Sequence, residues 1–152
     1  MRPIVFSLQF RGPARPVRLG RVRCMLWAPS SAVRTTVGPD GVSGGIEELP
    51  GAEARLESEF SFDGRSVFDG VGTIDFGDGH VLRFRSLGVG CLAPSPDPNL
   101  RHGASVREVE GGTGQFAGAT GLITSNFFIS DTGEVTDNDL GLIFVHERKE
   151  VK

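Results

Sequence analysis

Apolar and polar side chains alternate along residues 53–88, and this pattern predicts three β-strands. The strands expected are residues 53–62, 66–76 and 80–88. Because successive side chains of a strand point to opposite faces, each of them has one apolar face and one that carries the charged residues. The links Asp63 to Arg65 and Gly77 to Gly79 are short and contain glycine, as β-hairpin loops do. The stretch therefore predicts an antiparallel meander of three strands.

A three-residue loop at each hairpin also fixes the register of the meander. In that register apolar residues meet apolar partners on one face, and a slip of one residue would destroy this match. The pairs predicted in this way are Phe60 with Phe68, Leu56 with Gly72, Gly72 with Phe84, and Ile74 with Leu82.

Further strands are expected on both sides of the meander. Alternation from Ile4 to Phe10 predicts a half-buried strand, which Gly12, Pro13 and Pro16 are expected to end. The other strands are predicted at residues 17–27, 105–110, 122–129 and 134–146. Two long loops are expected at residues 28–50, with a short irregular strand at 32–37, and at residues 91–104, and a flexible tail at 147–152.

Seven or eight antiparallel strands without an amphipathic helix indicate an all-β protein. We expect a single antiparallel up-and-down β-barrel of about eight strands, because closure removes the free edges of so much β-structure. The 152 residues are most simply one domain, and 22 glycines favour many tight turns.

The stretch from Gly111 to Gly121, GGTGQFAGATG, holds the highest density of glycine in the chain. It resembles the GGTGxFxGAxG signature of the allene oxide cyclase-like and dirigent-like β-barrels, whose bacterial members include the spirotetronate-type cyclases. The resemblance extends to GVGTIDFGDGHVLRFRS upstream and covers about the last 90 residues. It implies a calycin-like barrel with an apolar small molecule inside, in which this turn is structural. A phosphate-binding loop is disfavoured, because the next segment is β-branched and aromatic and no Lys-Ser or Lys-Thr follows.

The composition limits which binding partners and which cellular compartment are expected for the protein. Two cysteines, Cys24 and Cys91, are too few for a disulfide framework and are expected to be buried free thiols, which indicates a cytoplasmic protein. The longest apolar run, Leu140 to Val145, is too short for a membrane helix. The arginines near the N-terminus fit loops and outer strand faces, so neither a nucleic-acid partner nor a membrane is expected. The scattered histidines predict no metal site.

The predicted register places a row of small residues, Ser58, Gly70 and Ser86, on the inner faces of three adjacent strands. Large side chains normally fill a small barrel, so this row leaves room for a ligand. A nearly equal alternative is that an aromatic residue fills the gap, or that glycine only permits curvature. The remaining residues expected around the cavity are Phe60, Phe68, Phe84 and Trp27, and the loop expected to cover its mouth contributes Pro94, Asp97, Arg101 and His102.

Catalytic residues are not identified by any motif, and Asn126 and His146 are the only candidates. Each faces inward if Leu122, Thr124 and Asn126, and likewise Leu140, Leu142 and Phe144, form the inner face. Ile123, Phe127 and Ile129 make an equally apolar alternative. The leading hypothesis is a cofactor-independent cyclase or isomerase of a polyketide- or fatty-acid-like intermediate, in a cavity poor in titratable groups. The alternative is a lipocalin-like or dirigent-like binding protein, and in either case a homodimer or homotrimer is an open expectation.

Overall fold

The computed structural model describes residues 1–64 and 66–147, and within them the chain is almost entirely β-structure. The tail expected at residues 147–152 therefore lies outside the described part except for Glu147. The elements, in order, are β1 (Arg2–Arg18), β2 (Arg21–Gly38), β3 (Gly41–Asp63), β4 (Val67–Asp75), β5 (Val81–Ser86), β6 (Gly90–Pro94), β7 (Leu100–Gly112), the 3-10 helix η1 (Gly114–Phe116), β8 (Thr120–Ser130) and β9 (Glu134–Val145).

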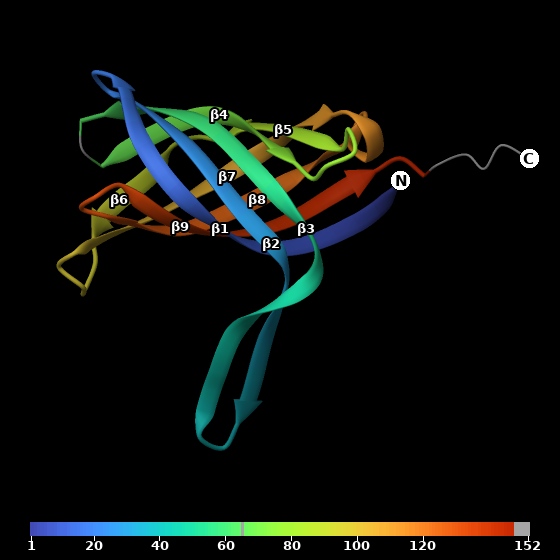
Figure 1. The fold of residues 1–152 in the computed structure, drawn as a ribbon, viewed down its shortest axis with the longest axis horizontal. Helices are drawn as coiled ribbons and strands as arrows, with labels where there is room; N and C mark the ends of the chain where they lie inside the picture. Colours follow the sequence, from blue (N-terminus) through green and yellow to red (C-terminus); the bar gives the residue numbers. More distant parts are fainter. Residues whose placement is uncertain (65, 148–152) are drawn as a thin grey trace, which may run out of the picture.

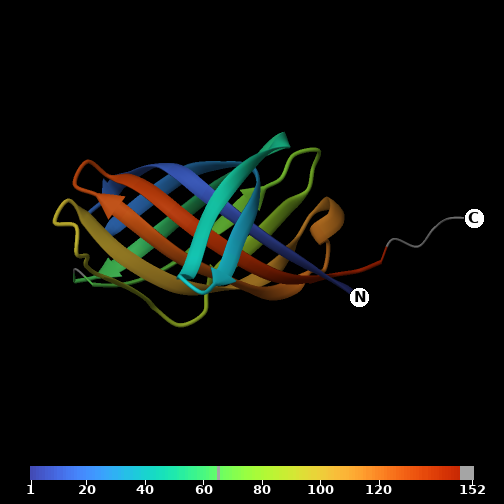
Figure 2. The same cartoon turned by 90° about the horizontal axis from the view of Figure 1, so that it is seen from below.

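The strands form one antiparallel sheet that closes in a ring (Figures 1 and 2). Neighbours in the sheet follow the order β3-β2-β1-β9-β8-β7-β5-β4, and the pairing of β4 with β3 completes the circuit. The remaining strand, β6, lies beyond the end of β5 and pairs with both β4 and β7. The expectation of an antiparallel all-β protein is thus confirmed, although residues 91–104 are strand and tight turn rather than a long loop.

Closure of the ring gives the sheet an inner face, and the core consists of the side chains on it. Within the ring, residues at alternate positions of the strands are buried or half-buried, as the pleat requires. The most deeply buried side chains include Phe10, Leu26, Leu56, Ile74, Leu82, Phe84, Ile123 and Ile143.

The meander is confirmed, but the loop of its first hairpin lies one residue later than expected, so each residue pairs with a partner two residues further along. Asp63 pairs with Val67, so that Phe62 lies opposite Phe68 and Phe60 opposite Gly70. A shift of two residues leaves each side chain on its predicted face and changes only its neighbours. Leu56 likewise faces Ile74 instead of Gly72, whereas the second hairpin has the predicted pairs of Gly72 with Phe84 and Ile74 with Leu82.

The first strand was expected to end at Gly12, but β1 continues to Arg18. Its prolines do not interrupt it because of where they fall: Pro13 is the last residue paired with β9, and Pro16 lies at an irregularity in the pairing with β2. A proline that cannot donate a ladder hydrogen bond is tolerated at such places.

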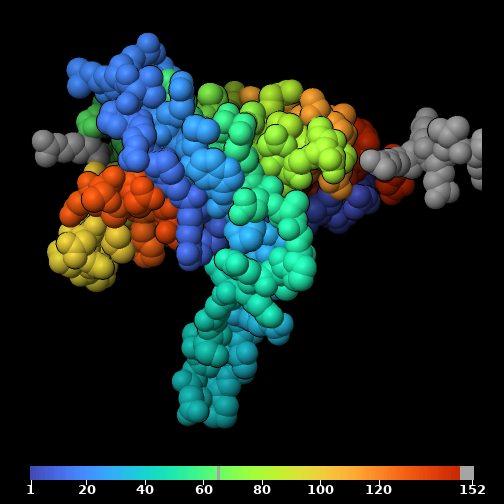
Figure 3. Space-filling view, in the orientation of Figure 1, coloured from blue at the N-terminus to red at the C-terminus, as the bar shows by residue number. Residues whose placement is uncertain are grey.

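Residues 28–50, expected to be a loop, extend β2 and β3 beyond the ring. Eight residue pairs, from Ser31 with Glu48 to Gly38 with Gly41, form a two-stranded hairpin that we call the arm (residues 31–48). The arm stands clear of the ring in the ribbon and space-filling views (Figures 1 and 3). Its composition of Ser, Gly and Pro had hidden a regular alternation, because Val33, Val37, Val42 and Ile46 occur at strand spacing.

The glycine-rich stretch is a turn that closes one end of the ring. Gly114 and Gly118 have φ of 58° and 69°, a region that glycine enters at little cost. Phe116 is buried between them and lies 5.1 Å from the ring centroid of Phe76. The backbone amide of Gln115 donates a hydrogen bond to His80 Nδ1 over 2.9 Å, so His80 supports this turn rather than being merely solvated. Among the described residues, no helix is long and apolar enough to cross a membrane.

Candidate functional site

A charged network lies inside the ring on the inner faces of β7, β8 and β9. Arg107 donates from Nη1 to Asp139 Oδ2 over 2.8 Å and from Nη2 to Asp137 Oδ2 over 3.0 Å. Ser125 donates to Asp137 Oδ1 over 2.6 Å and accepts a longer hydrogen bond of 3.3 Å from Arg107 Nη2. The exposed fractions of Arg107, Asp137 and Asp139 are 3%, 2% and 1%. Such burial of three charged side chains requires that they neutralise one another.

The network results from strand alternation and register. Ser105 and Arg107 occupy successive inward positions of β7, as Asp137 and Asp139 do on β9. Ser125 of β8 faces Ser105 on one side and Asp139 on the other, so a polar row crosses three strands. The long Arg107 side chain then reaches past β8 to both carboxylates.

The charged groups of the network shift one another's pKa values. Burial opposes the charge of Arg107, but the nearby carboxylates of Asp139 and Asp137 outweigh it and raise the pKa of the guanidinium above its ordinary value. Burial raises the pKa of Asp139 well above its ordinary value, and the neighbouring Asp137 adds to the shift while Arg107 opposes it. Protonation of Asp139 would leave one guanidinium with one carboxylate, which is an electrically neutral cluster.

Several polar atoms around the network lack a partner. The guanidinium lies 4.8 Å from the ring centroid of Phe84, an arrangement that stabilises a cation. Four buried side-chain atoms nevertheless have no hydrogen-bond partner: Ser58 Oγ, Ser105 Oγ, Arg107 Nε and Asp139 Oδ1. Unsatisfied buried polar atoms are uncommon in proteins and each of them calls for an explanation, such as a bound molecule.

A cavity of about 50 Å³ adjoins this network. Arg107, Asp137, Ser58 and Cys24 supply its polar groups, and burial raises the pKa of the Cys24 thiol to about 11 while the Ser58 hydroxyl opposes the shift. The volume suffices for a few water molecules, since one needs about 10–15 Å³. The remaining wall is apolar and includes Leu26, Leu56, Phe60, Phe62, Phe68, Leu92, Phe127, Ile129 and Val135.

The predicted row of small residues is only partly present. Gly70 and Ser86 are neighbours, because the Gly70 amide donates to Ser86 Oγ over 2.9 Å, but Ser58 lies opposite Gly72. A side chain at Gly70 would collide with the Glu59 carbonyl oxygen and the ring of Phe60. The aromatic ring thus fills the space beside Gly70, which was the alternative interpretation of this row.

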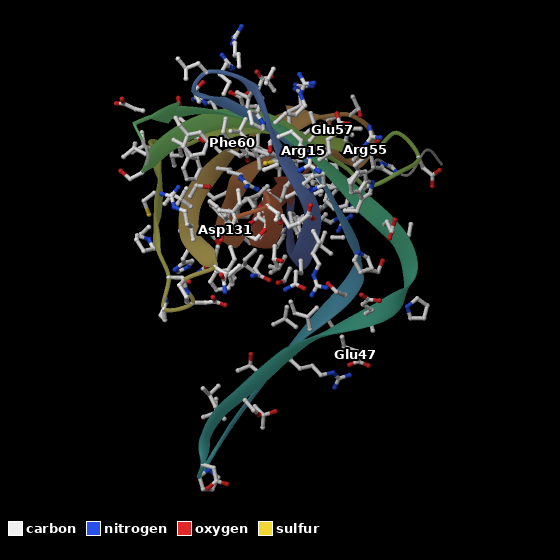
Figure 4. All side chains as sticks on the ribbon, turned by 60° about the vertical axis from the view of Figure 1, so that its left-hand side comes forward. Arg15, Glu47, Arg55, Glu57, Phe60 and Asp131 are labelled. Carbon is white, nitrogen blue, oxygen red and sulfur yellow. The ribbon has the colours of Figure 1, made fainter. Side chains whose placement is uncertain are left out.

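The aromatic residues expected around the cavity divide into two groups. Phe60 and Phe68 line it, and Phe84 lies beneath Arg107. Trp27 does not line the cavity, because it is on the outer face of β2 with 40% of its surface exposed. Figure 4 shows Phe60 at the ring and Glu47 of the same strand out on the arm.

The expected lid is part of the sheet wall. Pro94 ends β6 and pairs with Arg101 of β7, while Asp97 accepts a hydrogen bond from the Asn99 amide in the tight turn between them. His102 lies on the outer face of β7, and its ring is 5.3 Å from that of Phe128. From this segment Leu92, which was not predicted, is the side chain that lines the cavity.

Both catalytic candidates point away from the interior. Asn126 is on the outer face of β8, where its Oδ1 lies 2.7 Å from His102 Nε2. His146 follows β9 and is exposed, and Leu140, Leu142 and Phe144 also face outward. The inner face of β8 is the alternative one, with Ile123 and Phe127. The expectation that these two residues face the interior of the ring is therefore wrong.

The sequence interpretation also missed the charged residues of the interior, which it expected to be poor in titratable groups. A signal existed: Arg107 shares its strand face with Val109, and Asp137 and Asp139 share theirs with Val135 and Ile143. Charges in phase with buried residues identify an internal network once the inner face is known. Of the two cysteines, Cys24 is buried as expected, but Cys91 is exposed. Within the described residues, no group of three or more His, Cys, Asp or Glu side chains is placed to hold a metal ion.

Comparisons of this chain with protein-family models, with curated proteins and with solved structures found no match.

Proposed function

We propose that the protein binds an apolar small molecule carrying a carbonyl group inside the ring and isomerises or cyclises it without a cofactor. The observation that supports this most directly is the unpartnered, buried Nε of Arg107, a residue that lines an apolar cavity. A carbonyl oxygen would accept a hydrogen bond from this atom. Because the cluster of Arg107, Asp137 and Asp139 is neutral with Asp139 protonated, a neutral oxygen suits it better than a carboxylate.

The fold proposed with this function is an up-and-down barrel of the allene oxide cyclase-like and dirigent-like class. The closed ring of strands and the turn GGTGQFAGATG support that assignment. The resemblance further suggests a polyketide- or fatty-acid-like ligand and a cytoplasmic enzyme.

The chemistry proposed for the site is enolisation. Asp137, the carboxylate that lines the cavity, removes a proton from the carbon next to the carbonyl, and the electron pair moves onto the oxygen. Arg107 stabilises that oxygen, as preorganised donors do for developing oxyanions. Return of the proton to a different carbon isomerises the molecule. Attack of the enolate carbon on a second carbonyl carbon of the same molecule cyclises it, while the electron pair of that C=O bond moves onto its oxygen and this oxygen takes the proton back from Asp137. Neither route needs an oxidant or a reductant.

A ligand of this kind needs more room than 50 Å³, since small-molecule pockets span about 300–1,000 Å³. The apolar wall supplies the means to enlarge it. Phe68 has edge-to-face contacts with Phe60 at 5.4 Å and with Phe127 at 5.8 Å, and rotation of these rings would open the cavity.

Exchange of carbon-bound hydrogen tests the proposal without knowledge of the natural substrate. The probe is 2-tridecanone, an apolar ketone, whose binding is followed by ligand-observed NMR and whose α-hydrogen exchange in D2O is followed over time. We expect the protein to accelerate exchange, and Asp137→Asn or Arg107→Met to slow it at least tenfold. Arg85→Met, at an exposed ion pair on the outer face, is the matched control and should behave as the wild type.

Each other outcome contradicts part of the proposal. Binding without accelerated exchange would favour the second hypothesis, a lipocalin-like or dirigent-like binding protein. No binding of the ketone would contradict both. Equal exchange by the wild type and Asp137→Asn would remove the proposed base.

A further inference from the structure

The outer face of the ring is divided into a charged half and an uncharged half. On β3, β4 and β5 the outward positions include Glu57, Glu59, Asp69, Arg83 and Arg85. On β1, β9 and β8 a continuous region has no charge at all, although 23% of the chain is charged. The outward residues of this uncharged face are Pro3, Val5, Ser7, Gln9, Thr120, Leu122, Thr124, Asn126, Phe128, Asn138, Leu140, Leu142 and Phe144.

The uncharged face has an apolar centre. Leu142 lies between Val5 and Leu122 in the sheet, and all three are exposed. Leu140 and Phe144 extend the centre along β9, with 52% and 41% of their surfaces exposed. Depletion of charge around a cluster of large apolar residues is the composition that distinguishes the centre of a protein interface.

One of the two faces of the arm also carries exposed apolar side chains. Val33 pairs with Ile46 and Val37 with Val42, so all four side chains project from one face. Val37 and Val42 are 81% and 72% exposed. The other face is polar and holds the ion pair of Arg34 with Glu47. A two-stranded hairpin is at best marginally stable alone in water, and the apolar side of this one is largely exposed toward its tip.

The two apolar surfaces adjoin at the base of the arm. Ile46 lines a small crevice together with Trp27 of β2 and Gln9 and Arg11 of β1. The Ser31 hydroxyl donates to the Ser7 carbonyl oxygen over 3.2 Å, which ties the arm to the edge of the uncharged face. The arm projects from the wall of the ring at this point (Figures 1 and 2). The apolar side of the arm and the uncharged face thus form two walls of one open angle.

We propose that a second copy of this chain occupies that angle, with the uncharged faces in contact and each arm laid by its apolar side on the other copy. A twofold interface places the same patch on both sides, so an uncharged apolar surface is its own complement. A charged partner would find no counter-charges on the uncharged face itself, because the charged residues Arg11 and Glu48 lie only in the crevice at the base of the arm. The eight arm residues on the face of Val33 and Val37, together with the thirteen outward residues of the uncharged face, give a number near the roughly 20–30 per side of a standard interface.

The test measures the mass of the full chain in solution by sedimentation and by light scattering across the micromolar range. We expect twice the chain mass for the wild type. Leu142→Glu, at the centre of the uncharged face, should reduce it to the single-chain mass. Val71→Glu is the matched control, because Val71 is a similarly exposed strand residue on the charged half and should leave the mass doubled.

A second variant tests the proposal independently in case Leu142→Glu does not fold. Val37→Lys lies near the tip of the arm, where its side chain has no packing within the chain to lose, and should weaken association at least tenfold with an unchanged circular dichroism spectrum. A wild type of single-chain mass throughout would overturn the proposal, as would a doubled mass that both Leu142→Glu and Val37→Lys leave intact. A higher closed oligomer that both variants dissociate would contradict the twofold arrangement.

Discussion

Arg107 of β7 and Asp139 of β9 form an ion pair of 2.8 Å across the strand that separates them, with both side chains almost fully buried. The pair links the two strands on either side of β8 on the inside of the ring, where both side chains are shielded from bulk solvent. Removal of one charge from such a pair is costly because the other is left buried alone, whereas replacement of the whole cluster by apolar groups can be neutral. The first two predictions follow from this asymmetry.

Arg107→Met should lower the free energy of unfolding by about 3–5 kcal/mol, because it leaves two buried carboxyl groups without their cation. Urea unfolding followed by tryptophan fluorescence measures the change. Arg107→Met combined with Asp137→Leu and Asp139→Leu should recover most of the loss. A triple variant as unstable as the single one would show that the network stabilises the ring by more than mutual neutralisation.

Stability should fall as the pH rises above the ordinary range of a carboxyl group. Burial raises the pKa of Asp139 in the folded chain, so between about pH 4, where an unfolded Asp titrates, and that raised pKa the folded state holds the extra proton. Stability is therefore fullest at the acidic end of this window and declines toward its upper end. Asp139→Asn cannot titrate and should remove this contribution. Urea unfolding from pH 4.5 to 8 gives the comparison, and parallel pH profiles for the two proteins would contradict the prediction.

The two thiols should differ sharply in reactivity. At pH 8 a pKa of about 11 leaves about one Cys24 side chain in a thousand as thiolate, and burial also blocks access, whereas Cys91 is exposed. A chromogenic disulfide reagent should thus titrate one thiol promptly in the native protein and both in urea. Cys91→Ser should abolish the prompt reaction and Cys24→Ser should retain it. Prompt reaction of both thiols would mean that the cavity wall opens readily.

Filling the cavity should prevent ligand binding without unfolding the ring. Ser58→Leu removes a buried hydroxyl that has no partner and places an apolar side chain in the cavity, so the fold should tolerate it. We expect binding of the neutral dye N-phenyl-1-naphthylamine, followed by its fluorescence, to weaken at least tenfold, which is about 1.4 kcal/mol. Thr73→Leu, on the outer face of β4 opposite Glu57, is the control. Unaltered dye affinity in Ser58→Leu would place the binding site elsewhere.

The sequence by itself determined the class of fold and much of the pairing. Alternation in residues 53–88 gave the meander, because a half-buried strand needs a period of two whatever the rest of the chain does. The GDG loop also fixed the register of the second hairpin, since Phe76 and His80 do close it. In the first hairpin the loop lies one residue from its predicted position and the pairing register differs by two, which local turn composition could not exclude.

The tertiary structure alone decided which face of β8 and β9 is the inner one. Alternation divides a strand into two faces but does not name the buried one, and here Leu140, Leu142 and Phe144 made the outer face the more apolar. Because the sequence favours the more apolar face as the inner one, Asn126 and His146 are predicted to face inward, and Asp137 and Asp139 are not recognised as buried. The site depends on ring closure, because only closure brings Arg107 within reach of two carboxylates about 30 residues away in sequence. No local pattern carries that information.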